Sequence, residues 1–290
     1  MISFEYPVML VGANGMLGRA WRQELERSGI AYTAPSRECF NICDPEQIHR
    51  EIDGQLSAVI NCAGWTDVDG AEADPAGAMA LNASAPGNLA LACDHAGIPF
   101  VHYSTDYVFD GEVGSPYLPD DPRGPVNAYG RSKAIGENLV RMNSAHHLII
   151  RSSWLYAPWG KNFLRTMADI MRTNPKVRVV EDQIGRPTSA EWLAQASLRL
   201  LMTDKRGIWH VTDDGQCSWH RFALTIRDAL NLPCEVEPCA SSTYPRPASR
   251  PEWSVLDISR TTEAIGQAPH WEDSVRDAAR RATSDARIAA

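Results

Sequence analysis

The chain has 290 residues, of which 44% are hydrophobic, so it can bury a sizeable core as one large domain or as a dinucleotide-binding domain with a smaller lobe. Its formal net charge of −8 argues against nucleic acid or an anionic membrane as the main partner. Seven scattered cysteines without a C-x-x-C pair indicate reduced thiols in a cytoplasmic protein, and we expect neither a signal peptide nor a membrane-spanning segment.

The first predicted elements are a strand, a glycine-rich turn and a helix. An apolar run over residues 8–11 leads into Gly12, Gly15 and Gly18, and a helical pattern covers 16–28. Glycines at these spacings allow a tight turn, close approach of a pyrophosphate and close packing of helix on strand, with the helix N-terminus facing the phosphates. An ordinary glycine turn is the alternative, but the position directly after a strand favours a nucleotide-binding loop. The loop residues expected to bind the cofactor are Gly12, Asn14, Gly15, Met16 and Leu17.

The second predicted strand, over 30–34, ends where dinucleotide-binding folds select their cofactor. An acidic residue there binds the ribose hydroxyl of NAD, and a cation accommodates the 2′-phosphate of NADP. Ser36 and Arg37 follow this strand, and no acid stands at its end. Arg37 with Ser36 could hold a phosphate by charge-assisted hydrogen bonds, although a solvated surface arginine is the alternative. NADPH is therefore the expected cofactor, with NADH as the second choice.

The third predicted strand, over 58–61, points toward the same crevice, because ligands bind beyond the carboxyl ends of strands in open parallel sheets. Three small residues, Cys62, Ala63 and Gly64, follow it directly. Their size would let a cofactor lie close to the backbone, so we expect all three to contact it.

The fourth predicted strand, over 100–105, ends in Ser104 and Thr105, which could donate a hydrogen bond to a substrate carbonyl or simply cap a turn. Downstream, Tyr129 and Lys133 are four residues apart and so lie on one face of a helix. An ammonium beside a phenol favours its ionised form and makes the phenol a usable general acid or base. The same spacing occurs in simple surface pairs, but with the nucleotide loop and the Ser-Thr pair it predicts carbonyl reduction.

The rest of the chain continues the alternation of strands and helices, with helices predicted over 163–174, 190–201 and 219–230 and a strand over 177–180. Alternating units of this kind predict a Rossmann-type, doubly wound parallel sheet of the α/β class, with a smaller α/β C-terminal substrate lobe. The expected division assigns 1–152 and about 216–232 to the dinucleotide-binding domain. It assigns 153–215 and 233–290 to the lobe, with some strands returning to the main sheet.

A proline-rich stretch over 244–251 is either a linker or a loop that faces the substrate. We favour the loop, because proline stiffens the segment that carries Arg246 and Arg250. Two arginines held in this way could face a diphosphate at a low ordering cost.

Short motifs also occur along nearly the whole chain, at residues 12–18, 61–69, 104–111, 129–133, 151–156, 162–163, 182–188, 250–251 and 256–257. Together they resemble the extended short-chain dehydrogenase/reductases, and among these the dTDP-4-dehydrorhamnose reductase family. The glycine loop and the Tyr/Lys pair are shared across the superfamily. The Ser-Thr-Asp-Tyr-Val-Phe-Asp-Gly run at 104–111 and the Asp-Gln-Ile-Gly-Arg-Pro-Thr run at 182–188 are more particular to this family.

The resemblance implies reduction of the C4 keto group of a dTDP-linked 4-keto-6-deoxy sugar, giving dTDP-L-rhamnose. Tyr129 would protonate the nascent alkoxide, Lys133 would hold the nicotinamide ribose and lower the phenol pKa, and Thr105 would hydrogen-bond the carbonyl oxygen. Ser104 and Tyr129 would lie against the cofactor together with Lys133. The residues implied for the substrate are Thr66, Val68, Tyr107 and Trp154 at the sugar and Asn162, Arg186 and Arg250 at the nucleotide diphosphate. The alternatives are surface ion pairs for the arginines and a core position for the tryptophan.

Some family features do not carry over. Certain members pair through a magnesium site built from glutamates, but Ala20 stands at the first ligand position and only Glu191 matches a second, so no metal is assigned. Other interpretations are a reductase or epimerase of another nucleotide 6-deoxy-4-ketosugar, or a non-catalytic regulatory subunit that binds NADP. We expect a monomer or a homodimer.

Overall fold

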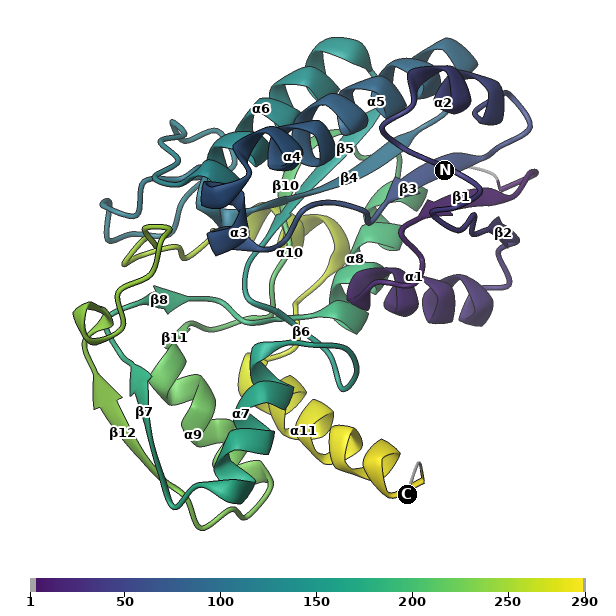
Figure 1. Cartoon of the computed structure of the whole chain (residues 1–290). Helices are drawn as coiled ribbons and strands as arrows, with labels where there is room; N and C mark the ends of the chain where they lie inside the picture. The colour runs from purple at the N-terminus through teal and green to yellow at the C-terminus, as the bar shows by residue number, and fades with distance from the viewer. Residues whose placement is uncertain (1–3, 289–290) are drawn as a thin grey trace.

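A six-stranded parallel sheet forms the centre of the larger part of the molecule in the computed structural model, which describes residues 4–288 (Figure 1). The strand order is β10-β5-β4-β3-β1-β2, so β2 and β3 lie on opposite sides of β1. In such sheets ligands bind beyond the carboxyl ends of the strands, at this reversal of strand order. The strands are β1 (Val8–Val11), β2 (Tyr32–Thr33), β3 (Ala58–Asn61), β4 (Phe100–Thr105), β5 (His147–Ser152) and β10 (Gly207–His210).

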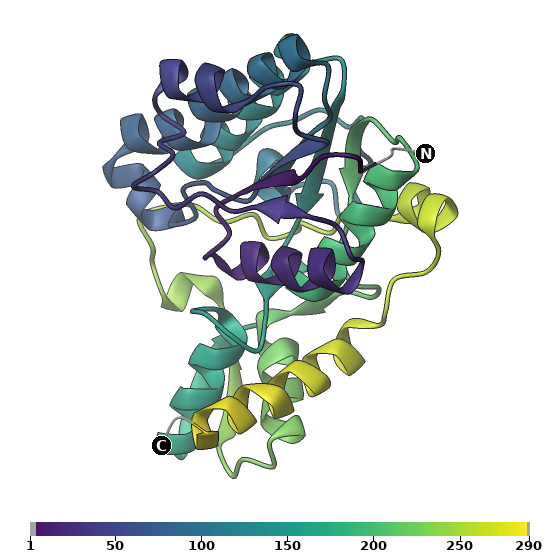
Figure 2. The ribbon, with the colours of Figure 1, turned by 90° about the vertical axis from the view of Figure 1, so that its right-hand side faces the viewer.

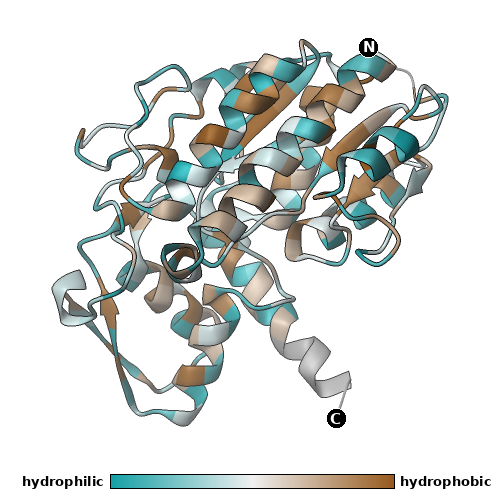
Figure 3. Cartoon of the chain, turned by 45° about the horizontal axis from the view of Figure 1, so that its top comes forward, coloured by the Kyte–Doolittle hydropathy of each residue, from teal (hydrophilic) through white to brown (hydrophobic). Residues whose placement is uncertain are grey.

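Helices cover both faces of this sheet, with α2, α5 and α6 on one face and α1, α8 and α10 on the other (Figures 1 and 2). Successive strand residues point to opposite faces. Ile60 therefore joins Trp21 of α1 in one apolar cluster, while Val59 joins Leu89 of α5 in another. Figure 3 shows the hydrophobic strands between the helices, and the arrangement confirms the predicted doubly wound α/β fold. The helices are α1 (Met16–Arg27), α2 (Pro45–Glu51), α5 (Ala85–Ala96), α6 (Ala128–Asn143), α8 (Ala190–Met202) and α10 (Ser259–Ile265).

The residues that precede and follow the helices explain where they begin and end. Helix α5 ends at Gly97, whose φ of 68° is the left-handed conformation that glycine adopts most easily. It continues α4 (Pro75–Met79) through a π-helical stretch, η1 (Ala80–Ser84). Short helices α3 (Val68–Ala73) and η2 (Asp106–Val108) follow β3 and β4. Side chains that accept a backbone N–H at helix starts include Asp44 for α2, Asn127 for α6, Asn162 for α7 (Phe163–Thr173), Ser189 for α8 and Ser218 for α9 (Trp219–Ala229).

A smaller lobe, drawn below the sheet in Figure 1, packs three helices on a parallel strand pair. Leu164, Phe222 and Trp271, one from each helix, are buried in its apolar cluster. The lobe consists of α7 (Phe163–Thr173), α9 (Trp219–Ala229), α11 (Trp271–Ile288), β7 (Lys176–Val180) and β12 (Glu235–Cys239). Other short elements are β6 (Leu155–Tyr156), β8 (Ile184–Gly185), β9 (Thr188–Ser189), β11 (Cys217–Ser218) and η3 (Ser241–Thr243).

The expected division of the chain is wrong in two places. Residues 216–232 were assigned to the dinucleotide-binding domain, but α9 packs with α7 and α11 because its buried face completes the apolar cluster of the lobe. Residues 190–215 were assigned to the lobe, but α8 packs on α1 and β10 extends the sheet beside β5. Strand β10 is thus one of the expected strands that return to the main sheet.

Asp213 is a buried carboxyl group that joins two connecting segments. It accepts hydrogen bonds from the Tyr156 hydroxyl at 2.7 Å and from the Ser189 amide at 3.1 Å. Burial raises its pKa to about 7, although both hydrogen bonds oppose the increase. Because an unfolded chain releases this proton near pH 4, the folded state holds one more proton between about pH 4 and pH 7. Stability therefore falls as pH rises through this window.

The Asp213→Asn variant should flatten this dependence, since the amide has no proton to lose. Between pH 5 and pH 8 we expect the melting temperature of the wild-type protein to fall more than that of the variant. The corresponding difference in the free energy of unfolding is on the order of a few kcal/mol. Thermal denaturation at several pH values measures this. Asp273→Asn, at an exposed position on α11, is the control and should keep the wild-type slope. Equal slopes for wild type and Asp213→Asn would contradict the assignment.

Candidate active site

The predicted Tyr/Lys pair lies in the first turns of α6, close behind its cap. Asn127 accepts the Gly130 amide at 2.7 Å and donates to the Ser249 carbonyl at 2.8 Å, which ties the start of the helix to the proline-rich loop. Lys133 is buried and donates to the carbonyl of Tyr103 in β4. Burial lowers the pKa of Lys133 to about 8, while the nearby carboxylate of Glu137 opposes that change. An ammonium is thus anchored directly behind the strand end.

The phenol of Tyr129 lies beside the hydroxyl of Thr105 at the end of β4. Burial raises the pKa of Tyr129 to about 12, and the hydrogen bond with Thr105 opposes the increase. The expected lowering of this pKa by Lys133 is wrong for this structure, because desolvation dominates and the ammonium is bonded to a backbone carbonyl. The ring of Tyr107 stands edge-on to Tyr129 with 6.0 Å between the centroids.

Asp106 is a buried neighbour whose role the sequence did not reveal. The Thr105 hydroxyl donates to its carboxylate at 2.9 Å and accepts the Tyr107 amide at 3.2 Å. Burial raises the pKa of Asp106 to about 6, and hydrogen bonds from Ser254 and Thr105 oppose the increase. A hydroxyl has one proton to donate. The protonation state of the Asp106 carboxyl group therefore decides whether Thr105 donates that proton to Asp106 or to a substrate oxygen.

The glycine loop has no space for side chains at two of its positions. A Cβ on Gly12, where φ is +76°, would lie 2.7 Å from the Ala63 nitrogen, and one on Gly18 would lie 2.2 Å from the Gly12 carbonyl oxygen. Helix α1 begins after Gly15 with no side-chain cap and no acidic residue in its first turn. Its first N–H groups are therefore available to an anion, and the partly exposed Cys62 and Ala63 border the loop. These features fit a dinucleotide.

The remaining cofactor candidates have different surroundings. Arg37 is exposed, and its guanidinium has no ion pair with any residue in the described part of the chain. The Ser36 hydroxyl bonds to Glu38 at 3.1 Å, an acid that sequence reasoning did not consider. Ser104 is buried, and its hydroxyl oxygen has no hydrogen-bond partner in the described part of the chain. Its expected contact with the cofactor stays a prediction.

Asn82 is a buried residue that the sequence analysis missed. In the π-helical stretch η1 its side chain accepts the Trp65 amide at 2.9 Å and donates to the Trp65 carbonyl and the Ser132 hydroxyl, both at 3.0 Å. π-Helical turns of this kind are frequent at functional sites. Here the turn joins the loop after β3 to the helix that carries the Tyr/Lys pair. An asparagine inside an alanine-rich helical pattern was the only signal in the sequence.

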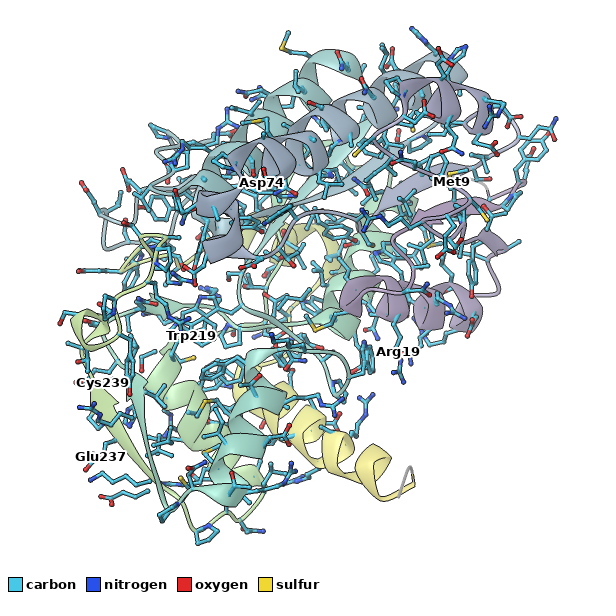
Figure 4. All side chains as sticks on the ribbon, in the orientation of Figure 1. Met9, Arg19, Asp74, Trp219, Glu237 and Cys239 are labelled. Carbon is cyan, nitrogen blue, oxygen red and sulfur yellow. The ribbon has the colours of Figure 1, made fainter. Side chains whose placement is uncertain are left out.

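The candidate sugar contacts fall into two groups. Thr66 is exposed, and the partly exposed Val68 begins α3. Trp154, with a φ of 48°, stacks on Trp219 at 3.6 Å between ring centroids and leaves no room for a side chain at Gly185. Figure 4 labels Trp219 at the upper end of α9. Trp219 is not among the predicted site residues, and no local sequence pattern around it indicates this stacking.

The candidates for the diphosphate all have partners within the chain. Arg250 forms two hydrogen bonds of 3.0 Å with the carboxylate of Asp69, and Arg246 lies 3.6 Å from it. The hydrogen bond from Arg250 lowers the pKa of Asp69. Arg186 lies 3.4 Å from Asp214. An incoming diphosphate would have to compete with these carboxylates.

Asn162 differs from the arginines, because it caps α7 and its amide lies among backbone carbonyls. Asn162 is 9% exposed and its amide hydrogens are already bonded to these carbonyls, so the structure does not favour the expected contact with the diphosphate. Glu191, the possible metal ligand, forms two hydrogen bonds of 2.8 Å with Arg281. Among the side chains that the structure describes, those of His, Cys, Asp and Glu form no group of three that could hold a metal ion. Nor does any helix of the described residues have the length and apolar character to cross a membrane.

The fold is a Rossmann sheet with a glycine loop after β1. Thr105 lies at the carboxyl end of β4, and Tyr129 and Lys133 lie in the first turns of α6. Together these features define the class of short-chain dehydrogenase/reductases. Residues 6–284 match the profile of the family described as RmlD substrate binding domain. The chain belongs to this family.

Named relatives share most of their length with this chain. It is 38% identical to the dTDP-4-dehydrorhamnose reductase of Burkholderia thailandensis over 92% of its own length and 96% of that protein. It is 35% identical to the spore coat polysaccharide biosynthesis protein SpsK of Bacillus subtilis, with coverage of 93% and 95%. The crystal structure of the dTDP-4-dehydrorhamnose reductase of Bacillus anthracis in complex with NADP superposes with a TM-score of 0.90, at 32% identity and with coverage of 94% and 98%.

Proposed function

We propose that the protein reduces the C4 keto group of dTDP-4-dehydro-L-rhamnose with NADPH and so forms dTDP-L-rhamnose. The observation that carries this proposal is the meeting of Thr105, Tyr129 and Lys133 beside the glycine loop, in a chain whose relatives carry the name of this reductase. A bound dihydronicotinamide supplies the hydride. The chain's own residues then supply the proton and the binding of the carbonyl oxygen.

The raised pKa of Tyr129 suits the direction of reduction. A phenol with a pKa of about 12 is protonated at neutral pH, so it holds the proton that the C4 oxygen needs when it becomes an alkoxide. The Lys133 ammonium, held by the carbonyl of Tyr103 near the end of β4, would bind the nicotinamide ribose. The hydroxyl of Thr105 neighbours the phenol and can orient the same oxygen of the substrate.

The binding groups follow from the same geometry. Gly12, Gly15 and the first turn of α1 would hold the pyrophosphate of NADPH, because that turn has neither a side-chain cap nor an acidic residue. Thr66, Val68, Tyr107 and Trp154 would border the sugar. Arg250 and Arg186 would exchange their carboxylate partners for the diphosphate of the substrate.

Arg37 supports the choice of NADPH over NADH, because its exposed guanidinium forms no ion pair with any residue that the structure describes. Replacing it by alanine should raise the dissociation constant for NADPH about tenfold and leave the constant for NADH unchanged, since only NADPH carries the 2′-phosphate. Fluorescence titration with each cofactor measures both constants. Arg50→Ala on α2, where Arg50 is an exposed residue paired with Glu51, is the matched control. An equal loss for both cofactors would contradict this role.

The proposed reaction is tested by following NADPH absorbance with purified protein and enzymatically prepared dTDP-4-dehydro-L-rhamnose. Substrate-dependent oxidation with formation of dTDP-L-rhamnose is expected. Oxidation only with other 4-keto-6-deoxy nucleotide sugars would indicate a related reductase, and conversion without net oxidation would indicate an epimerase. NADPH binding without any turnover would indicate the regulatory subunit.

We further propose a cytoplasmic monomer or homodimer that needs neither nucleic acid nor a membrane as partner. The support is the negative charge and the seven cysteines, none of which is in a disulfide. Sedimentation of the purified protein measures the oligomeric state.

A further inference from the structure

We propose that the loop over residues 157–162, between β6 and α7, positions the phosphate-binding helix α1 for the cofactor. The loop would act through Trp159 and Asn162, which connect the first turn of α1 to the smaller lobe. Neither residue would touch the cofactor. The inference rests on the proposed NADPH-dependent function and adds two positioning residues to it.

Asn162 closes the loop on itself. Its side-chain oxygen accepts the Arg165 amide at 3.2 Å and so caps α7. Its amide nitrogen faces the carbonyl oxygens of Ala157 at 2.9 Å, Trp159 at 3.0 Å and Gly160 at 3.4 Å. Because an amide has only two N–H groups, these acceptors compete for it and hold it in one orientation. One buried side chain thus fixes both the shape of the loop and the start of α7.

The closed loop then contacts the first turn of α1. The Trp159 indole donates to the Met16 carbonyl at 3.1 Å, and the Asn162 amide lies 3.5 Å from the Met16 sulfur. Trp159 is 5% exposed and belongs to the apolar cluster that covers this face of the sheet. The guanidinium of Arg19 lies 4.5 Å from the centre of the indole, a cation–π distance, and Figure 4 labels Arg19 at this end of α1.

This contact matters because the same turn of α1 presents the N–H groups for the phosphates. The turn has no side-chain cap and no acidic residue, so its direction depends on what packs against it. Holding the Met16 carbonyl fixes that direction before the cofactor arrives, and preorganisation of this kind improves affinity without any added contact to the ligand. The loop also ends at the cap of α7, so the positions of cofactor and lobe are coupled.

Two variants separate this role from simple stability. Asn162→Ser keeps a side chain that can cap α7 but removes the amide donors. Trp159→Phe keeps an aromatic ring beside Arg19 but removes the indole donor. Each should raise the dissociation constant for NADPH about fivefold, as expected for one lost hydrogen bond. With saturating NADPH and sugar, kcat should stay at the wild-type value, because the Tyr129 and Thr105 contacts are unchanged.

The control is Ser218→Ala, which removes the cap of α9 in the same lobe without touching α1. It should lower the melting temperature and leave the NADPH constant unchanged. Fluorescence titration with NADPH alone gives the constants, and circular dichroism shows that each variant is folded. If wild type binds NADPH and both folded variants bind it equally well, the inference is overturned and the proposed reaction stands. If wild type binds no NADPH, both proposals are overturned.

Discussion

Replacing Tyr129 by phenylalanine is expected to lower kcat for ketosugar reduction by about a thousandfold, within the range that a general acid contributes. The variant keeps the ring that meets Tyr107 and loses only the hydroxyl that bonds to Thr105. Since the phenol pKa is about 12, the wild-type hydroxyl carries its proton throughout the neutral range, and water would have to replace it. Steady-state rates of NADPH oxidation at saturating substrate measure the effect.

The affinity for NADPH should not change in this variant, because the loss is confined to proton transfer. Tyr6→Phe is the matched control, since Tyr6 is 50% exposed ahead of β1, at the opposite end of the strand from the glycine loop. It should keep wild-type rates. An unchanged kcat in Tyr129→Phe would remove Tyr129 as the acid and move the assignment to another donor.

The largest effect on stability is expected at Glu137, whose side chain is fully buried in α6. It receives two hydrogen bonds of 2.8 Å from Arg151 and one of 3.0 Å from Arg123. Burial alone would raise the pKa of Glu137, but the hydrogen bonds and charge of Arg151 hold it below its usual value. Glu137→Leu would leave the buried Arg151 without its anion, which costs about 3–5 kcal/mol. Urea denaturation measures the free energy of unfolding.

Glu137→Gln should lose less than the leucine variant, because the amide oxygen can still accept a hydrogen bond from Arg151. Glu263→Gln is the control, since Glu263 is exposed on α10, and it should stay within about 0.5 kcal/mol of wild type. A leucine variant as stable as wild type would contradict this role of Glu137, because the buried Arg151 would then tolerate the loss of its anion.

Much of the sheet could be predicted because its central strands are continuous apolar runs. The expected strands over 58–61 and 100–105 coincide with β3 and β4, which are buried along their whole length. The strand expected over 30–34 is reduced to Tyr32–Thr33, since β2 lies at the edge of the sheet and has a single neighbour. The bounds of strands with a neighbour on each side could therefore be predicted from local sequence more accurately than those of the edge strand.

The placement of the candidate site residues was also predictable, because Thr105 ends a strand and Tyr129 and Lys133 lie four residues apart on one helix. The contacts that were missed join distant parts of the chain. Asp69 and Arg250 are 181 residues apart, and the pairing of Trp154 with Trp219 depends on where α9 packs. The expected division placed α8 in the lobe and α9 in the dinucleotide-binding domain, the reverse of where they lie. Both helices have an apolar face, and only tertiary packing decides which surface that face covers.

Transfer of deuterium from NADPH to the sugar tests the central claim most directly. NADPH labelled stereospecifically at C4 of the nicotinamide, in each of its two forms, is incubated with the protein and dTDP-4-dehydro-L-rhamnose, and the nucleotide sugar is analysed by mass spectrometry. The proposed reaction predicts dTDP-L-rhamnose one mass unit heavier with one labelled form and unlabelled product with the other. No reduced sugar, or unlabelled product with both forms, would contradict the reaction proposed for this site.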